Sequence, residues 1–140
     1  MDLTTDPIAF LNAQPGGWVK EMGITILEAS RDRVTCEWDV TDKHHQGYGI
    51  VHGGVHSGVV ETLASIGAAL AAHPNRVVGL ENSTSFIRAV RSGRLHAAAT
   101  PITRGRRSQV WEASVWDAQE RLVAVGRVRL LTLEPERDLG

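Results

Sequence analysis

The chain has 140 residues, a formal net charge of −1 and one cysteine, Cys36. The length predicts one domain with a sizeable core, and the near-zero charge disfavours a nucleic-acid-binding protein. One cysteine excludes a disulfide framework and a cysteine-based zinc cluster. The first residues lack the features of a signal peptide, and no apolar run stays free of charge for the roughly 18 residues of a membrane span. We therefore expect a single domain over residues 1–140 in the cytoplasm, with no membrane partner.

The N-terminal third predicts a short helix and two strands. Residues 1–20 are expected to form a helix or turn, with a helical segment at 7–12 that is broken by Pro15, Gly16 and Gly17. Strands are predicted at 23–30 and 33–40. Period-two alternation in the second strand indicates one buried face, which holds Val34, Cys36, Trp38 and Val40.

A long helix is predicted over residues 53–72, because Pro74 cannot continue it. Two stripes run along this helix at three- and four-residue spacing. The apolar stripe is expected to pack in the core and holds Val55, Val59, Leu63, Ile66 and Leu70. The second stripe is small or polar and holds Gly54, Ser57, Gly58, Glu61, Ser65 and Ala68.

Turn signals at short intervals predict an antiparallel meander after the helix. The strands are expected at 77–90, 93–104, 108–117 and 121–133, followed by a frayed polar tail at 134–140. One helix and one sheet bury each other only if the helix lies across a sheet face. We therefore predict an α+β fold in which a curved antiparallel sheet of about six strands wraps one central helix.

Glu61 stands in an otherwise small or apolar segment, where an unused carboxylate is costly to bury. A functional carboxylate is one interpretation. The alternatives are an ion pair with Arg88 or an exposed surface position. The helix begins with His52 and two glycines, so its first N–H groups are accessible and suited to binding an oxyanion or polarising a carbonyl. The alternative there is that Gly53 and Gly54 only allow a tight turn.

Gly53 and Glu61 are too far apart to share a site within one chain. Eight residues of helix span roughly 12 Å, whereas reacting atoms approach to about 3–3.5 Å. Two antiparallel copies of the helix would bring the start of one beside the middle of the other. The sequence therefore predicts a homodimer with two shared sites.

The segment from Gln46 to Ser65 resembles the hotdog-fold acyl-CoA thioesterases, and the resemblance extends over residues 23–133. It is similar to the branch with a helix glutamate, which includes the 4-hydroxybenzoyl-CoA, 1,4-dihydroxy-2-naphthoyl-CoA, enterobactin-proofreading and phenylacetate-degradation-type thioesterases. The matching positions are Gln46, His52, Gly53, Glu61 and Ser65. Close relatives often carry a polar residue where this chain has Phe86 and Ile87, which leaves the acyl group and the CoA contacts open.

The resemblance implies hydrolysis of an acyl-CoA thioester without a cofactor other than the CoA of the substrate. Gly53 N–H would polarise the thioester carbonyl, and Glu61 would act as nucleophile or general base. Gln46 and His52 would orient the carbonyl, the water or the loop. Ser65 would hydrogen-bond to Glu61 or to the water. Aryl and short or medium alkyl groups, and a dimer or a dimer of dimers, all remain open.

Arginines that follow the helix are candidates for the CoA phosphates, because the guanidinium fork suits phosphate oxygens. The predicted CoA contacts are Arg88, Arg91, Gly105, Arg106, Arg107 and Ser108. A solvated basic turn is the alternative interpretation of the same residues.

Two other functions remain open from the sequence. One is a metal hydrolase that uses the closely spaced histidines, although the zincin motif requires Glu where Gly53 stands. These histidines are His44, His45, His52 and His56. The other is a non-catalytic acyl-CoA-binding or regulatory protein of the same fold, since fold alone does not fix function.

Overall fold

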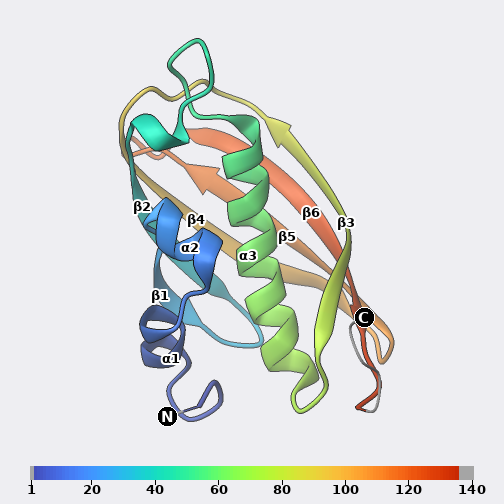
Figure 1. The fold of residues 1–140 in the computed structure, drawn as a ribbon. Coiled ribbons are helices and arrows are strands. Elements are labelled where there is room, and N and C mark those ends of the chain that lie inside the picture. The colour runs from blue at the N-terminus through green and yellow to red at the C-terminus, as the bar shows by residue number, and fades with distance from the viewer. Residues whose placement is uncertain (1, 136–140) are drawn as a thin grey trace.

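A computed structural model describes residues 2–135 and shows one long helix lying across a six-stranded sheet (Figure 1). The helix is α3 (Gly53–Ala72), and its bounds are those predicted. The strand order is β1-β2-β4-β5-β6-β3, and all neighbours are antiparallel. The strands are β1 (Thr25–Ala29), β2 (Val34–Val40), β3 (Val77–Phe86), β4 (Gly93–Arg104), β5 (Ser108–Trp116) and β6 (Leu122–Thr132). The predicted α+β architecture is confirmed.

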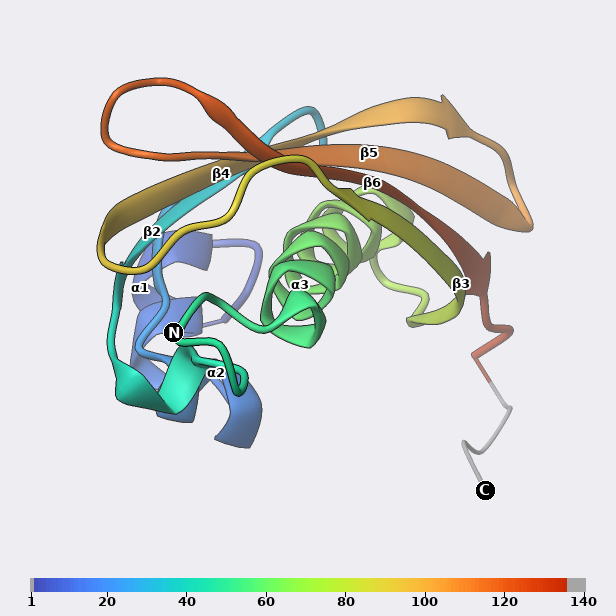
Figure 2. The same cartoon turned by 90° about the horizontal axis from the view of Figure 1, so that it is seen from above.

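The sheet curves around α3, which occupies its concave face (Figure 2). Val55, Val59 and Leu63 of the predicted apolar stripe are buried, whereas Ile66 and Leu70 are half-buried. Ala68 was predicted on the small or polar stripe, and that assignment is wrong. It is fully buried, and its carbonyl accepts a hydrogen bond from Gln109 Nε2 at 3.1 Å.

Close contact between α3 and β5 explains a glycine in the middle of the helix. A Cβ on Gly67 would lie 2.3 Å from the Trp111 ring. Trp111 is fully buried, and its Nε1 donates to Gln109 Oε1 at 2.8 Å. The Gln109 amide therefore joins the indole of β5 to the backbone of α3 at Ala68.

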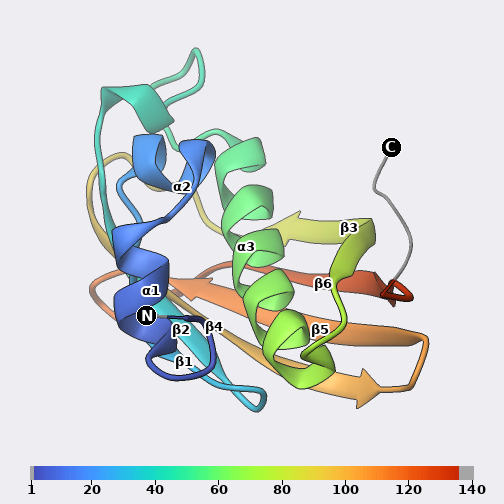
Figure 3. The same cartoon turned by 60° about the horizontal axis from the view of Figure 1, so that its bottom comes forward.

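Two helices precede the sheet where the sequence predicted one (Figure 3). They are α1 (Pro7–Ala13) and α2 (Gly17–Met22). The predicted break is present at residues 14–16, and a second helix that was not predicted begins at Gly17. Trp18 of α2 lies against α3, since a Cβ on Gly58 would be 2.4 Å from its ring. This tertiary contact, and not local propensity, accounts for so short a helix.

The two edges of the sheet differ. Asn12 of α1 covers the β1 edge, because its Nδ2 donates to Ile26 O and its Oδ1 accepts from Ile26 N–H, both at 2.9 Å. Within residues 2–135, β3 pairs with β6 alone and leaves its other side unpaired. β3 ends at Phe86, before the predicted end of this strand at residue 90. Residues 136–140 of the predicted tail lie outside the described residues.

By length and mean hydropathy alone, α3 would pass for a membrane span. Eight of its residues are buried against the rest of the chain, which is how a core helix behaves.

Candidate functional site

The start of α3 presents a free backbone donor. His52 is the N-cap, and its Nδ1 accepts a hydrogen bond from Gly54 N–H at 2.7 Å. Val55 N–H donates to the carbonyl of His52 at 2.9 Å. Gly53 N–H has no partner among the described residues. A lone N–H at the positive end of a helix can polarise a carbonyl or stabilise an oxyanion.

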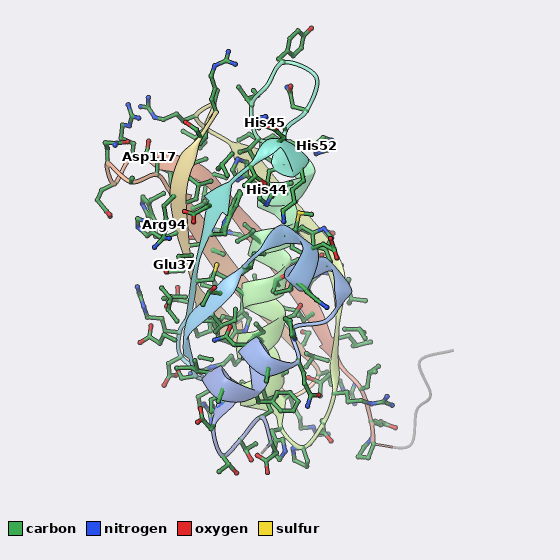
Figure 4. All side chains as sticks on the ribbon, turned by 60° about the vertical axis from the view of Figure 1, so that its left-hand side comes forward. Glu37, His44, His45, His52, Arg94 and Asp117 are labelled. Atoms are coloured by element: carbon green, nitrogen blue, oxygen red, sulfur yellow. The ribbon has the colours of Figure 1, made fainter. Side chains whose placement is uncertain are left out.

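The neighbouring histidines hold the loop that precedes α3. Figure 4 shows His44, His45 and His52 together where the 3-10 helix η1 (Asp42–His44) meets α3, whereas Glu37 and Arg94 lie away from them along β2 and β4. His44 Nδ1 accepts from Thr41 N–H at 2.9 Å, so the proton sits on Nε2, which donates to the Met22 carbonyl at 2.9 Å. His44 is therefore a buried, structural histidine.

Gln46 begins a tight turn in the same loop. Its side-chain oxygen accepts from Tyr48 N–H, and its backbone N–H donates to Ile50 O at 2.8 Å. Gly49 in this turn has a φ of 74°, which favours glycine. Arg91 donates from its guanidinium to Tyr48 O at 3.1 Å, so this predicted CoA ligand helps to hold the turn.

A cavity of about 270 Å³ lies beside Gly53. It brings together three predicted site residues, Gln46, Gly53 and Arg88, with His56, and apolar side chains form much of the remaining wall. The ring of Phe86 lies directly over Gly53, because a Cβ there would be 2.5 Å from two of its carbons. The cavity lining is Gln46, Ile50, Val51, Gly53, His56, Phe86, Ile87, Arg88 and Ala89.

Glu61 faces a different region, between α2 and β3. It is exposed in the single chain, so the expectation of a buried carboxylate is wrong for one chain alone. None of the described residues forms an ion pair or hydrogen bond with it, so the alternative of an ion pair with Arg88 is also wrong for one chain. Gly79 of β3 lies beside it, since a Cβ there would be 3.8 Å from the carboxyl carbon, which is an ordinary van der Waals contact.

Two cavities adjoin Glu61 on the α2 side. One, of about 290 Å³, holds Ser65 together with apolar residues of the N-terminal helices and β1. The other, of about 480 Å³, runs beside Trp18 and Gly58. Neither cavity is lined by Gly53. A single chain thus brings Ser65 to Glu61, but it places Gly53 and Gln46 at a separate cavity.

The predicted CoA-binding residues lie near opposite ends of α3. Arg88 lies at the cavity beside Gly53. The turn formed by Gly105, Arg106, Arg107 and Ser108 joins β4 to β5, next to the C-terminal half of α3. Within the same basic segment, Arg94 pairs with Asp39 at 2.9 Å and Arg104 pairs with Asp32 at 2.9 Å.

The described part of the chain contains no group of three or more His, Cys, Asp and Glu side chains arranged to hold a metal ion. Both His44 and His52 use Nδ1 as an acceptor for a backbone N–H. Through these hydrogen bonds, His44 holds the loop and His52 caps the helix.

Comparison with known proteins decides the family. Residues 48–124, more than half of the chain, match the family model described as the thioesterase superfamily. This chain belongs to the thioesterase superfamily. The resemblance drawn from the motif is confirmed, and the protein is a thioester hydrolase with a hotdog fold.

Several members of the superfamily are similar over most of their length. The protein Rv1847 of Mycobacterium tuberculosis is 40% identical over 118 residues, which are 81% of this chain and 84% of that protein. The 1,4-dihydroxy-2-naphthoyl-CoA hydrolase of Listeria monocytogenes is 35% identical over 112 residues, covering 79% and 91%. The structure of the thioesterase SAV0944 of Staphylococcus aureus gives a TM-score of 0.80 at 27% identity, covering 83% of this chain and 98% of that one.

The cavity beside Gly53 contains one residue that the sequence did not single out for substrate binding or catalysis. His56 is 3% exposed and lines the cavity beside Gly53. Its ring centroid is 6.3 Å from those of Trp38 and of Phe86. Burial lowers the pKa of His56 to about 4, so the ring is neutral near pH 7. The only signal in the sequence was its place in the first turn of the helix.

Proposed function

We propose that this thioesterase hydrolyses an acyl-CoA thioester to the free acid and CoA at a site shared by two chains. The observation that supports it most is that α3 carries two unpaired functional groups at different cavities along its length. Gly53 N–H lines one cavity, and the Glu61 carboxylate lines two others. Neither group forms a hydrogen bond or ion pair with any of residues 2–135. Relatives of the chain named for CoA thioester hydrolysis support the substrate class.

A second copy of the chain would complete each site. Gly53 and Glu61 lie eight residues apart on one straight element, roughly 12 Å by helical rise. If the α3 helices of two chains lay antiparallel, Gly53 of one chain would lie beside Glu61 of the other. Each site would then take Gln46, His52 and Gly53 from one chain and Glu61 with Ser65 from its partner.

The β3 edge is the surface that we assign to this pairing. Natural proteins seldom leave a long strand edge open, and the opposite edge of this sheet is blocked by Asn12. Leu80 in β3, Phe86 at its end and Ile87 beyond it are 50%, 57% and 54% exposed. Exposed apolar side chains along an open edge favour association with another chain. A homodimer follows, and a dimer of dimers would need a further surface.

Hydrolysis of the thioester can follow either of two routes. In one, Glu61 accepts a proton from a water whose oxygen attacks the thioester carbonyl. In the other, the Glu61 carboxylate attacks that carbon itself, and water then hydrolyses the anhydride. In both, Gly53 N–H stabilises the oxyanion, the carbon–sulfur bond breaks and the CoA thiolate leaves to be protonated. Ser65 would orient the carboxylate or the water, and Gln46 and His52 the carbonyl and loop.

The positions of variants made in a relative support the choice of residues. Structures of the S. aureus protein SAV0944 carry alanine in place of a glutamine and of a glutamate that stand fifteen residues apart. Gln46 and Glu61 have the same spacing.

The CoA phosphates would be bound by arginine. Arg88 is exposed at the cavity beside Gly53 and is our first candidate. Arg106 and Arg107, with Gly105 and Ser108, lie too far along the sheet to meet that cavity in the same chain. They would contact CoA only at a site that a partner completes.

A thiol-release assay against a panel of aryl and alkyl CoA thioesters tests the proposal. Wild-type protein should release CoA from at least one member of the panel. Glu61→Gln should lower kcat by roughly 100-fold or more and change the unfolding midpoint little, because none of the described residues of its own chain pairs with the carboxylate. Near-normal turnover by Glu61→Gln would remove Glu61 from the mechanism.

A further inference from the structure

The turn at residues 46–50 carries Gln46 and projects beyond the start of α3 (Figure 1). Tyr48 at its tip is 85% exposed. Two backbone hydrogen bonds close the turn, from Gln46 N–H to Ile50 O at 2.8 Å and from Gly49 N–H to Gln46 O at 3.0 Å. These bonds shape the turn, but they do not fix where it lies against the rest of the chain.

Arg91, in the segment between β3 and β4, holds the turn on both sides of Gln46. Its guanidinium Nη1 donates to Tyr48 O at 3.1 Å, and its backbone carbonyl accepts from His45 Nε2 at 2.7 Å. A Cβ on Gly49 would lie 3.3 Å from the same guanidinium nitrogen, so the side chain packs closely on the turn. One residue thus contacts the chain before and after Gln46.

The turn in its place determines where the Gln46 amide lies. Gln46 Oε1 accepts from the N–H of Tyr48, the residue whose carbonyl binds Arg91. The Nε2 group has no partner among residues 2–135, and Gln46 lines the cavity beside Gly53. An amide NH₂ is a hydrogen-bond donor, so it can bind a carbonyl oxygen there. Displacement of the turn would move this donor, and small errors in position cost catalytic rate.

Arg88 and Arg91 stand three residues apart but lie in different surroundings. Arg88 lines the cavity beside Gly53, and its guanidinium forms no ion pair or hydrogen bond with any of residues 2–135. Arg91 does not line that cavity, and its guanidinium is engaged with the turn. The two predicted CoA ligands are therefore expected to differ in role.

We infer that Arg91 is a positioning residue, which fixes the turn and thereby places the Gln46 amide for the thioester carbonyl, and that it does not bind the CoA phosphates. The inference rests on the proposed function, because Gln46 acts there on that carbonyl. A residue that places a catalytic group affects the chemical step, whereas a phosphate ligand affects the binding of CoA.

Steady-state kinetics of Arg91→Met separate these two roles. Methionine keeps much of the apolar stem and removes the guanidinium donors. With the acyl-CoA that wild-type protein hydrolyses fastest, we expect kcat to fall roughly tenfold and KM to change by less than about threefold. Arg88→Met is the matched contrast, since loss of a phosphate ligand should raise KM. Arg91→Lys keeps a donor for Tyr48 O and should recover part of the lost kcat.

A substrate without phosphates gives a second comparison. The N-acetylcysteamine thioester of the same acyl group has the reacting carbonyl and lacks the nucleotide. If wild-type protein hydrolyses it, Arg91→Met should lower its turnover by about the same factor as that of the acyl-CoA. The kinetics with acyl-CoA decide the inference if it is not hydrolysed.

A double variant tests whether Arg91 acts through Gln46. Once Gln46→Ala has removed the amide, adding Arg91→Met should slow the enzyme by less than about twofold further, because both changes remove the same interaction. Unfolding midpoints near that of wild type check that the variants fold. A raised KM with near-normal kcat in Arg91→Met, or losses that multiply in the double variant, would overturn the inference and leave the proposed function standing. Absence of acyl-CoA hydrolysis by wild-type protein would overturn both.

Discussion

The N–H of Gly53 can be deleted without removing any side chain. Proline is well tolerated at the first position of a helix, and His52 has φ −62° and ψ 133°, which suits a residue before proline. We expect Gly53→Pro to lower kcat roughly 100- to 1,000-fold, as loss of an oxyanion donor does. Steady-state kinetics with the preferred acyl-CoA would measure this.

Gly53→Ala is the matched control for that variant. Both substitutions add a Cβ that would lie 2.5 Å from the Phe86 ring, and both force this exposed ring to move. Only proline lacks the N–H. Equal losses in the two variants would assign the effect to Phe86 and remove Gly53 N–H from the mechanism.

His56 predicts a pH dependence of stability. Its pKa is about 4 in the folded chain and near the ordinary value of 6.5 in the unfolded chain. Below pH 6.5 the unfolded state therefore binds a proton that the folded state does not, and stability falls until about pH 4. Between pH 7 and pH 5 this one residue should cost about 2 kcal/mol of unfolding free energy.

Urea unfolding of wild-type protein and His56→Leu at both pH values measures that contribution. The variant cannot titrate at this position, so its loss of stability should be smaller than that of wild type by about 2 kcal/mol. The same loss in both proteins would show that His56 is not held neutral by the fold.

The sequence identified the candidate site residues whose residue type and position are unusual by themselves. It did not identify those whose role depends on tertiary contacts. Glu61 stood out because a carboxylate is unusual in an apolar helix, and Gly53 because a helix start exposes N–H groups. Glu61 is exposed and His56 is buried because different elements cover the two sides of α3. The local sequence of the helix does not show which elements these are. For the same reason, only the structure shows that Arg94 and Arg104 are held in ion pairs and that Arg88 lies at the cavity.

At the scale of elements, two helical glycines make different contacts. A Cβ on Gly67 would overlap Trp111, which is fully buried and cannot move aside. A Cβ on Gly58 would overlap Trp18, which is 40% exposed and can rotate outward. We expect Gly67→Ala to destabilise the fold by about 1–3 kcal/mol, the usual cost of overpacking.

Gly58→Ala is the control, because both substitutions gain about 1 kcal/mol of helix propensity. It should be near neutral in urea unfolding. A stable Gly67→Ala protein would contradict the close packing of α3 on β5.

Elements with a clear period were predictable, and those built by tertiary contact were not. The bounds of α3 follow from its glycine start and the proline after its end, and β2 follows from strict alternation. The helix α2 has six residues and starts at glycine, so local propensity argued against it. Its contact with Gly58 stabilises it, and residues of α2 line both cavities beside Glu61.

At the scale of the whole molecule, we predict a stable dimer through the β3 edge. Ile87 lies just beyond β3 and Leu80 within it, and both are about half exposed in one chain. A charge at the edge of a pairing surface opposes association. Leu80→Lys should therefore shift the protein toward monomer in analytical ultracentrifugation and lower activity in parallel. An active monomer would contradict the shared site.

Complementation between two inactive variants tests the shared site most directly. We expect Gly53→Pro and Glu61→Gln each to be inactive alone, whereas a dimer containing one of each holds one site with both functional groups intact. Unfolding and refolding an equal mixture should recover about a quarter of wild-type activity, since half of the dimers are mixed and half of their sites are complete. No recovery from a mixture in which mixed dimers are present would show that each chain must supply both groups itself.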